Sequence, residues 1–141
     1  IRMFPSDANP AGNVFGGAIL KHIDMVAGIV AQRYSQTNAV TVSMDKISFL
    51  KPVFVGNVLF VNARVNYVQK SSMEIEVNVE AEDIAKGTRV HTGNAYVTFV
   101  ALDNNGKPTP VPTLCIDNPE DQKRFDEGKL RMEHRIKERK K

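Results

Sequence analysis

The chain has 141 residues, of which 42% are hydrophobic and 25% charged, a composition typical of one soluble globular domain. Its single cysteine, Cys115, excludes an internal disulfide, and no apolar run reaches the length of about 18 residues that a membrane span needs, so we expect a cytoplasmic protein without a membrane partner. The net charge of +3 lies wholly after residue 119, and the chain lacks tryptophan and any interleaved basic and aromatic stretch, so nucleic acid is not an expected partner.

The first elements expected are a loop and a long helix. Residues 6–17 are rich in Asn, Asp, Pro and Gly, which favour turns. From residue 17 to residue 34, apolar side chains recur with helical spacing and spread over most of the circumference. Such a helix must be buried almost all round. At 1.5 Å per residue it spans roughly 27 Å, so we expect it to be the central element of the domain.

Four strands are expected after the helix, because apolar and polar side chains then alternate with a period of two. The segments are 40–49, 59–67, 73–81 and 90–102. The first changes phase between Met44 and Ile47, which indicates a bulge. In the third, glutamates alternate with apolar residues and are expected to face water while the apolar set faces the helix. The pattern predicts an α+β fold in which one antiparallel sheet curls around a single helix.

The C-terminal part of the chain is different in composition. Three prolines keep residues 107–112 extended. Residues 119–141 alternate acidic and basic side chains and have few apolar ones, so we expect a charged helix that projects or packs on a neighbour. The predicted organisation is therefore one domain over residues 1–118 and a helical extension over residues 119–141.

Asp24 is the first candidate for chemistry. It lies at the margin of the apolar stripe of the predicted helix, with Gly28 one turn further on. A carboxylate in that position is poorly solvated, which suits a general base or a nucleophile that attacks a carbonyl carbon. The same position also suits a carboxylate that only forms a structural pair across an interface. The residues by themselves leave both interpretations open.

Three residues near the start of the helix could assist such an attack. Gly16 and Gly17 offer backbone N–H groups at the positive end of the helix dipole, which suits a developing oxyanion, and Gly17 is the preferred donor. Alternatively, the glycines only let the loop turn. The Asn13 amide could hold the carbonyl oxygen or an attacking water, or could only stabilise the loop.

Several stretches of the chain resemble one known family, the acyl-CoA hydrolases of the brain-type group and their single-domain bacterial relatives. The stretches are PSDANPAGNVFGG at 5–17, IDMVAGIVA at 23–31, TVSMDKI at 41–47, KSSMEI at 70–75 and KRFDEGK at 123–129. This resemblance covers nearly the whole chain. It implies the hot-dog fold, with a long central helix wrapped by a curved antiparallel sheet, and the hydrolysis of fatty acyl-CoA to free acid and CoA.

The resemblance also implies roles for particular residues. Asp24 and Asn13 match the catalytic aspartate and asparagine, which come from different domains in the two-domain relatives. A homodimer is therefore implied, and a trimer of dimers beyond it. For the CoA moiety, the polar turn of Lys70, Ser71 and Ser72 is the first candidate, and Gly16 and Arg89 are further ones. Without the resemblance, residues 69–72 would be interpreted as an ordinary polar hairpin. His22, His91 and His134 lack ligand spacing, so neither a metal nor a diffusible cofactor is expected.

Three rival functions remain possible at this point. A hot-dog sensor would bind acyl-CoA without turnover and would have no use for the Asp24 carboxylate. An acyl dehydratase needs a histidine paired with an acid, and His22 is two residues from Asp24 and points away from it on a helix. A purely structural oligomer would not need the loop of asparagine and glycine residues.

Overall fold

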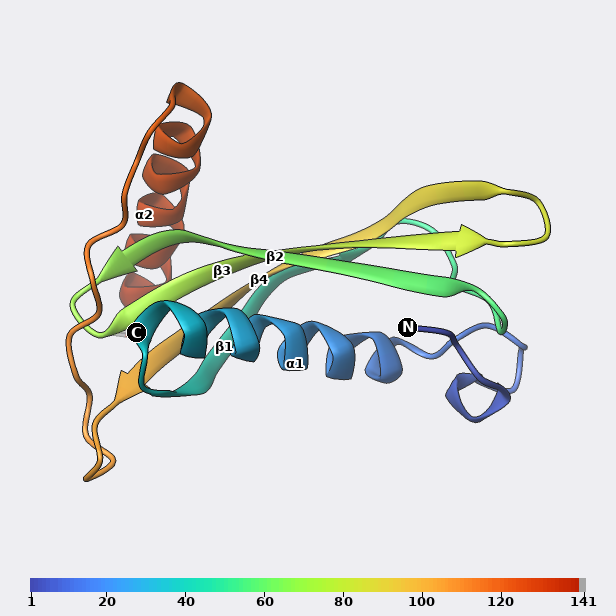
Figure 1. Cartoon of the computed structure of the whole chain (residues 1–141), viewed down its shortest axis with the longest axis horizontal. Helices are drawn as coiled ribbons and strands as arrows, with labels where there is room; N and C mark the ends of the chain where they lie inside the picture. Colours follow the sequence, from blue (N-terminus) through green and yellow to red (C-terminus); the bar gives the residue numbers. More distant parts are fainter. Residues whose placement is uncertain (140–141) are drawn as a thin grey trace.

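The computed structural model describes residues 1–139 and contains one antiparallel sheet between two helices (Figure 1). The elements in chain order are a 3-10 turn Pro5–Asp7, α1 Gly16–Ser35, β1 Asn38–Phe49, β2 Val58–Gln69, β3 Ser72–Asp83, β4 Thr88–Leu102 and α2 Pro119–Arg139. Figure 1 shows α1 along one face of the curved sheet and α2 on the opposite side. The predicted α+β class, the hot-dog fold with its central helix and the charged C-terminal helix are confirmed.

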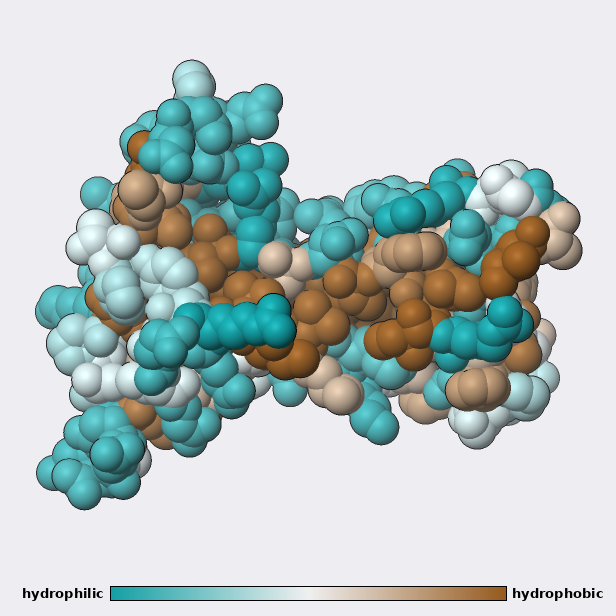
Figure 2. Space-filling model, in the orientation of Figure 1, coloured by the Kyte–Doolittle hydropathy of each residue, from teal (hydrophilic) through white to brown (hydrophobic). Residues whose placement is uncertain are grey.

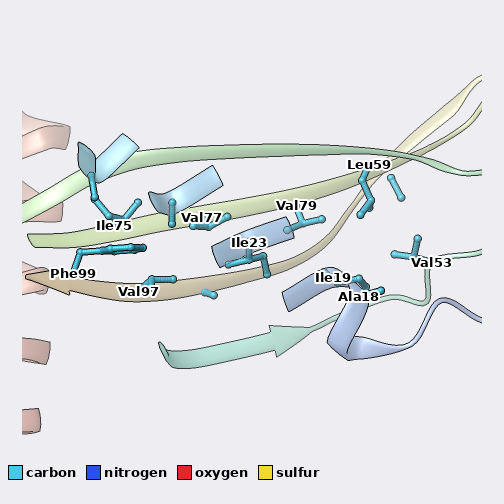
Figure 3. Close-up of a cluster of buried hydrophobic side chains, with 14 of the residues drawn as sticks. Ala18, Ile19, Ile23, Val53, Leu59, Ile75, Val77, Val79, Val97 and Phe99 are labelled. Atoms are coloured by element: carbon cyan, nitrogen blue, oxygen red, sulfur yellow. The ribbon is translucent and has the colours of Figure 1, made fainter. Parts of the chain in front are cut away.

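Helix α1 packs on the sheet through a single stripe of small and branched side chains. The buried apolar residues of this stripe are Ala18, Ile19, Ile23, Ala27 and Ala31. Their spacing of three to four residues places them on one side of the helix. Figure 3 shows Ile23 facing Val77, Val79 and Val97 of the sheet. The helix ends at Ser35, and the next residue, Gln36, adopts the left-handed conformation with φ of 58° and donates its N–H to the Gln32 carbonyl.

The prediction that this helix is buried almost all round is wrong for the single chain. Met25 is 54% exposed and Ile29 is 48% exposed. The reason is that the sheet covers only one side of α1, and no other described element covers the opposite side. Figure 2 shows hydrophobic residues gathered in a band across the face on which α1 lies. One apolar side of the central helix is therefore open in the isolated chain.

The sheet has the strand order β1-β4-β3-β2, with each neighbouring pair antiparallel. The four predicted strand segments are all present. β1 forms one edge and pairs only with β4. Its register shifts between Thr41 and Ser43 and again between Asp45 and Ser48. The second shift confirms the bulge that the change of phase predicts, and the first one was not predicted.

One end of the outer face of the sheet is covered by α2, contrary to two predictions (Figure 1). Glu74 was expected to face water and is only 4% exposed. It accepts two hydrogen bonds from the Arg131 guanidinium of α2, at 2.9 and 2.6 Å. Helix α2 also buries Met132 and brings Gly128 against Tyr67. The charged helix therefore packs on the sheet of its own chain, where its arginines pair with acidic side chains of the outer face.

The predicted division of the chain falls where α2 begins, at Pro119. A separate extension over residues 119–141 stays a prediction, and residues 140 and 141 lie outside the described part. Within residues 1–139, no helix is both long enough and apolar enough to cross a membrane.

Candidate active site

Asp24 lies on α1 beside the edge strand β1. Its side chain is half-buried, and its Oδ1 accepts a hydrogen bond of 2.7 Å from the hydroxyl of Thr41. The carboxylate is therefore held at one oxygen. Among the described residues, no side chain or backbone group donates a hydrogen bond to Oδ2. A carboxylate that is oriented through one oxygen and open at the other can act as a base or a nucleophile.

The loop before α1 is ordered by the side chain of Asn9. Its Oδ1 accepts hydrogen bonds from the backbone N–H groups of Ala11, at 3.0 Å, and Asn13, at 3.2 Å. The Asn9 backbone N–H donates to the Asn13 carbonyl at 2.7 Å. With its oxygen fixed in this way, the Asn9 side chain keeps its NH₂ group as a donor of defined direction. The Asn13 side chain makes no hydrogen bond within the described residues, although its backbone is paired with Phe54.

The beginning of α1 leaves backbone donors free. The residue that precedes the helix is Phe15, and no side chain caps this end. The first N–H groups of a helix have no partner within it, and the hydrogen bonds of the preceding loop do not use those of Gly16 and Gly17. Gly17 is exposed. The predicted oxyanion donors are therefore unblocked, at the end of the helix where its dipole is positive.

These groups do not meet in one chain. Gly17 precedes Asp24 by seven residues on α1, which is roughly 10.5 Å along the helix axis. Asn9 and Asn13 lie in the loop that precedes the helix. A thioester carbonyl cannot contact donors and carboxylate across such a gap. The Asp24 carboxylate and the donors near the start of α1 can act on one substrate only if they come from two different copies of the chain.

The predicted CoA-binding residues are also divided between the two ends of the molecule. Lys70, Ser71 and Ser72 form the β2–β3 turn at one end, and Lys70 lines a groove of about 320 Å³ beside Val111. Arg89 lies at the other end of the sheet, roughly 35 Å away along β4. Its guanidinium already pairs with Glu80 and stacks on the Phe60 ring at 3.7 Å. Gly16 lies beside the Phe49 ring at the start of α1.

Sequence reasoning missed two residues of this site, Thr41 and Asn9. Thr41 begins a stretch whose resemblance to the family was recognised, but only the fold brings it to Asp24 from a distance of 17 residues. Asn9 had a local signal. In an Asx turn, an asparagine side-chain oxygen accepts a hydrogen bond from the backbone N–H two residues later. Asn9 and Ala11 have this spacing, and they form this bond.

The absence of a metal or other cofactor stays a prediction. Within residues 1–139, no three His, Cys, Asp or Glu side chains lie close enough to hold a metal ion.

A curved antiparallel sheet packed on one long central helix defines this chain as a hot-dog domain. Residues 11–88, more than half of the chain, match the family model described as thioesterase superfamily. The chain belongs to the thioesterase superfamily.

Three comparisons with known proteins agree with this assignment. The cytosolic acyl coenzyme A thioester hydrolase of Rattus norvegicus is 42% identical over 129 residues, which is 90% of this chain and 34% of that protein. The chain thus spans about a third of the length of this rat relative. The acyl-CoA hydrolase of Staphylococcus aureus superposes with a TM-score of 0.90 at 34% identity, over 99% of this chain and 85% of that one. A hexameric acyl-CoA thioesterase superposes with a TM-score of 0.92 at 32% identity, over 98% and 88%.

The Staphylococcus aureus enzyme has been characterised structurally with alanine in place of an asparagine, an aspartate and a threonine. The aspartate follows the asparagine by 15 positions, and the threonine follows the aspartate by 17. The same two intervals separate Asn9 from Asp24 and Asp24 from Thr41 in this chain. Asn13 precedes Asp24 by 11 positions.

Proposed function

We propose that this chain is a subunit of an acyl-CoA thioesterase, which hydrolyses fatty acyl-CoA to the free acid and CoA with Asp24 as its reactive group. The observation that carries the proposal is the hydrogen bond of 2.7 Å from Thr41 to Asp24 Oδ1, which leaves Oδ2 available. The names of the relatives from Rattus norvegicus and Staphylococcus aureus support a thioester of CoA as the substrate. The name of the rat relative also supports a cytoplasmic location.

The chemistry fits a carboxylate without a strong acid beside it. The leaving group of a thioester is a thiolate, which departs with little help from a proton donor. Asp24 therefore has one main task, either to remove a proton from water or to attack the carbonyl carbon itself. The negative charge that develops on the carbonyl oxygen would be held by the Gly17 N–H and by an asparagine amide.

A shared active site is part of this proposal. The gap of roughly 10.5 Å between Gly17 and Asp24 in one chain requires that the donors and the carboxylate come from different copies. A homodimer that covers the open side of α1 would bury Met25 and Ile29 and further desolvate Asp24. A trimer of such dimers agrees with the hexameric state named for one structural relative.

Two asparagines are candidates for the amide that meets the substrate. Asn13 is the residue predicted from the family resemblance, and its side chain is unengaged. Asn9 is supported by the interval of 15 residues to Asp24 and by its oriented NH₂ group. A donor that is fixed before the reaction costs less reorganisation than a free one, so we favour Asn9 for this role.

We expect Asn9→Ala to lower kcat for acyl-CoA by roughly 100-fold, and Asn13→Ala to lower it less than about tenfold, because only Asn9 has an oriented amide donor. Rates of thiol release for the two purified variants check this. The reverse order would assign the role to Asn13.

The Asn9→Asp variant separates the catalytic donor from the structure of the loop. A carboxylate at this position still accepts the N–H groups of Ala11 and Asn13, but it has no N–H to donate. Asn9→Asp should therefore be as inactive as Asn9→Ala and should melt at the wild-type temperature. An active Asn9→Asp enzyme would mean that Asn9 only orders the loop.

For the CoA moiety we retain Lys70, Ser71 and Ser72 as the first candidates, because the Lys70 ammonium has no ion-pair partner among the described residues and is free to meet a phosphate. Gly16 would contribute its backbone N–H. Arg89 would have to leave Glu80 or bind through its remaining N–H groups.

The function is tested by measuring thiol release from acyl-CoAs of graded chain length with the purified protein. We expect saturable hydrolysis of at least part of the series. Tight binding of acyl-CoA without any thiol release would instead identify a non-catalytic sensor, the alternative that the sequence left open.

A further inference from the structure

Strand β1 connects the two helices across the sheet in a way that a regular strand could not. Thr41 pairs with Phe99, whose ring lies next to Gly28 of α1. Ser43 pairs with Thr98, which faces the α2 side of the sheet beside Glu74. Directly paired residues of antiparallel strands point to the same face. Thr41 and Ser43 therefore point to opposite faces, although residues two apart in a regular strand share one.

The cause of this arrangement is the bulge at Val42. One extra residue in β1 shifts the register between Thr41 and Ser43 and reverses the side-chain phase. On one face the Thr41 hydroxyl donates to Asp24 at 2.7 Å. On the other face the Ser43 hydroxyl accepts a hydrogen bond of 2.8 Å from the Arg135 guanidinium of α2. Only two peptide units thus separate Thr41, which orients Asp24, from Ser43, which Arg135 of α2 holds.

This link matters because β1 is an interrupted edge strand within the single chain. It lies at the edge, pairs with β4 alone and is interrupted by two shifts of register. A bulged edge strand lacks some of its ladder hydrogen bonds, so its position depends on contacts from side chains. Ser43 is held from α2 by Arg135, and Ser43 in turn donates to Asp45 at 3.2 Å. Arg135 forms no ion pair with a described residue that would compete for its guanidinium.

We propose that Arg135 of α2 is a positioning residue of the active site, which holds the Val42 bulge through Ser43 and so keeps the Thr41 hydroxyl on Asp24. This proposal rests on the thioesterase function proposed above and assigns the C-terminal helix a part in it. Arg135 contacts Ser43 on the face of the sheet opposite to the Thr41 and Asp24 pair. Its effect passes through Thr41, so it should change the turnover of bound substrate more than the binding of CoA.

The test compares Arg135→Met, Arg135→Lys and Ser43→Ala in steady-state hydrolysis of the best acyl-CoA of the graded series. We expect Arg135→Met and Ser43→Ala each to lower kcat roughly tenfold with KM changed less than about twofold, because misplacement of a catalytic group affects the chemical step. Arg135→Lys, whose ammonium can still donate to Ser43, should recover most of the rate.

The decisive measurement repeats Arg135→Met in a Thr41→Val background. If Arg135 acts through Thr41, the double variant is no slower than Thr41→Val alone. The proposal is wrong if the two substitutions lower kcat independently, so that their fold-losses multiply in the double variant. It is also wrong if Arg135→Met mainly raises KM. Arg124→Met is the matched control, because Arg124 also joins α2 to the sheet but pairs with Asp121 and Glu76, away from β1. It should keep the wild-type kcat.

The outcomes separate this inference from the function on which it rests. If the wild-type protein hydrolyses no acyl-CoA, both are wrong. If the wild type is active and needs Asp24, but Arg135→Met and Ser43→Ala turn over normally, only the role of Arg135 is wrong. If Arg135→Met does not fold, Ser43→Ala removes the same hydrogen bond with a small change and decides the question.

Discussion

Replacing Asp24 by Asn is expected to abolish nearly all turnover of acyl-CoA, with a fall in kcat of roughly 1,000-fold or more, while CoA still binds. The amide has the size of the carboxylate, and its oxygen can still accept the hydrogen bond from Thr41 that holds the side chain at 2.7 Å. It can neither remove a proton from water nor attack a carbonyl. Thiol release measures the rate, and calorimetric titration with CoA measures binding. Unchanged activity would end the proposal for Asp24.

Thr41→Val is the matched control for orientation. It keeps the shape of the side chain and the charge of Asp24, and it removes only the donated hydrogen bond. A smaller loss, on the order of tenfold, is expected from it. A single turnover in ¹⁸O-labelled water then distinguishes the two roles of Asp24, because label that enters the Asp24 carboxylate would exclude the general-base mechanism.

Mixed oligomers test whether the site is shared. Asp24→Asn and Asn9→Ala damage different components, and in a dimer each site would draw its aspartate from one copy and its asparagine from the other. The two inactive variants are mixed in equal amounts and reassembled. About half of the dimers are then mixed, and one of the two sites in each mixed dimer is intact, so about a quarter of the wild-type activity should return. No recovery after verified exchange of subunits would show that each chain contains its own complete site.

The second large effect concerns stability. We expect Arg131→Met to lower the free energy of unfolding by about 3 kcal/mol, because it leaves the Glu74 carboxylate buried without its partner. The side chains of the pair are 19% and 5% exposed, and two hydrogen bonds join them. Burial, the largest effect, lowers the pKa of Arg131, and the hydrogen bond and charge of Glu74 more than offset it, so the pKa is raised. Urea unfolding at constant protein concentration gives the measurement.

Two further variants serve as controls for the prediction on Arg131. Arg131→Met combined with Glu74→Met removes both charges and should regain most of the lost stability. Lys123→Met breaks the exposed pair of Lys123 and Glu127 on the same helix and should cost less than about 0.5 kcal/mol. If Arg131→Met were no more destabilising than Lys123→Met, the pair would not be what holds α2 on the sheet.

Elements with a clear period could be predicted from the sequence. Helix α1 and strands β2, β3 and β4 lie within a few residues of the predicted ranges, because their apolar side chains recur with the period of the structure they form. The position of Asp24 beside the apolar stripe followed from the same period. The family was inferred from the resemblance to acyl-CoA hydrolases, because the spacing of apolar residues does not identify a family.

Contacts between distant segments could not be predicted in this way. The alternation of glutamates in β3 indicates which side chains share a face, but it does not reveal that α2 covers Glu74 with Arg131. The same limit applies to Thr41, because a bulge depends on how β1 pairs with β4 and not on the composition of β1 alone.

The sequence by itself determined the elements of this protein, the central helix with Asp24 on it and the family to which the chain belongs, because these depend on local spacing and on residue identity. Only the tertiary structure decided which groups meet. It joins Thr41 to Asp24 and Arg135 to Ser43. The physical reason is that such contacts arise from packing of whole elements, which bring together residues far apart in the chain.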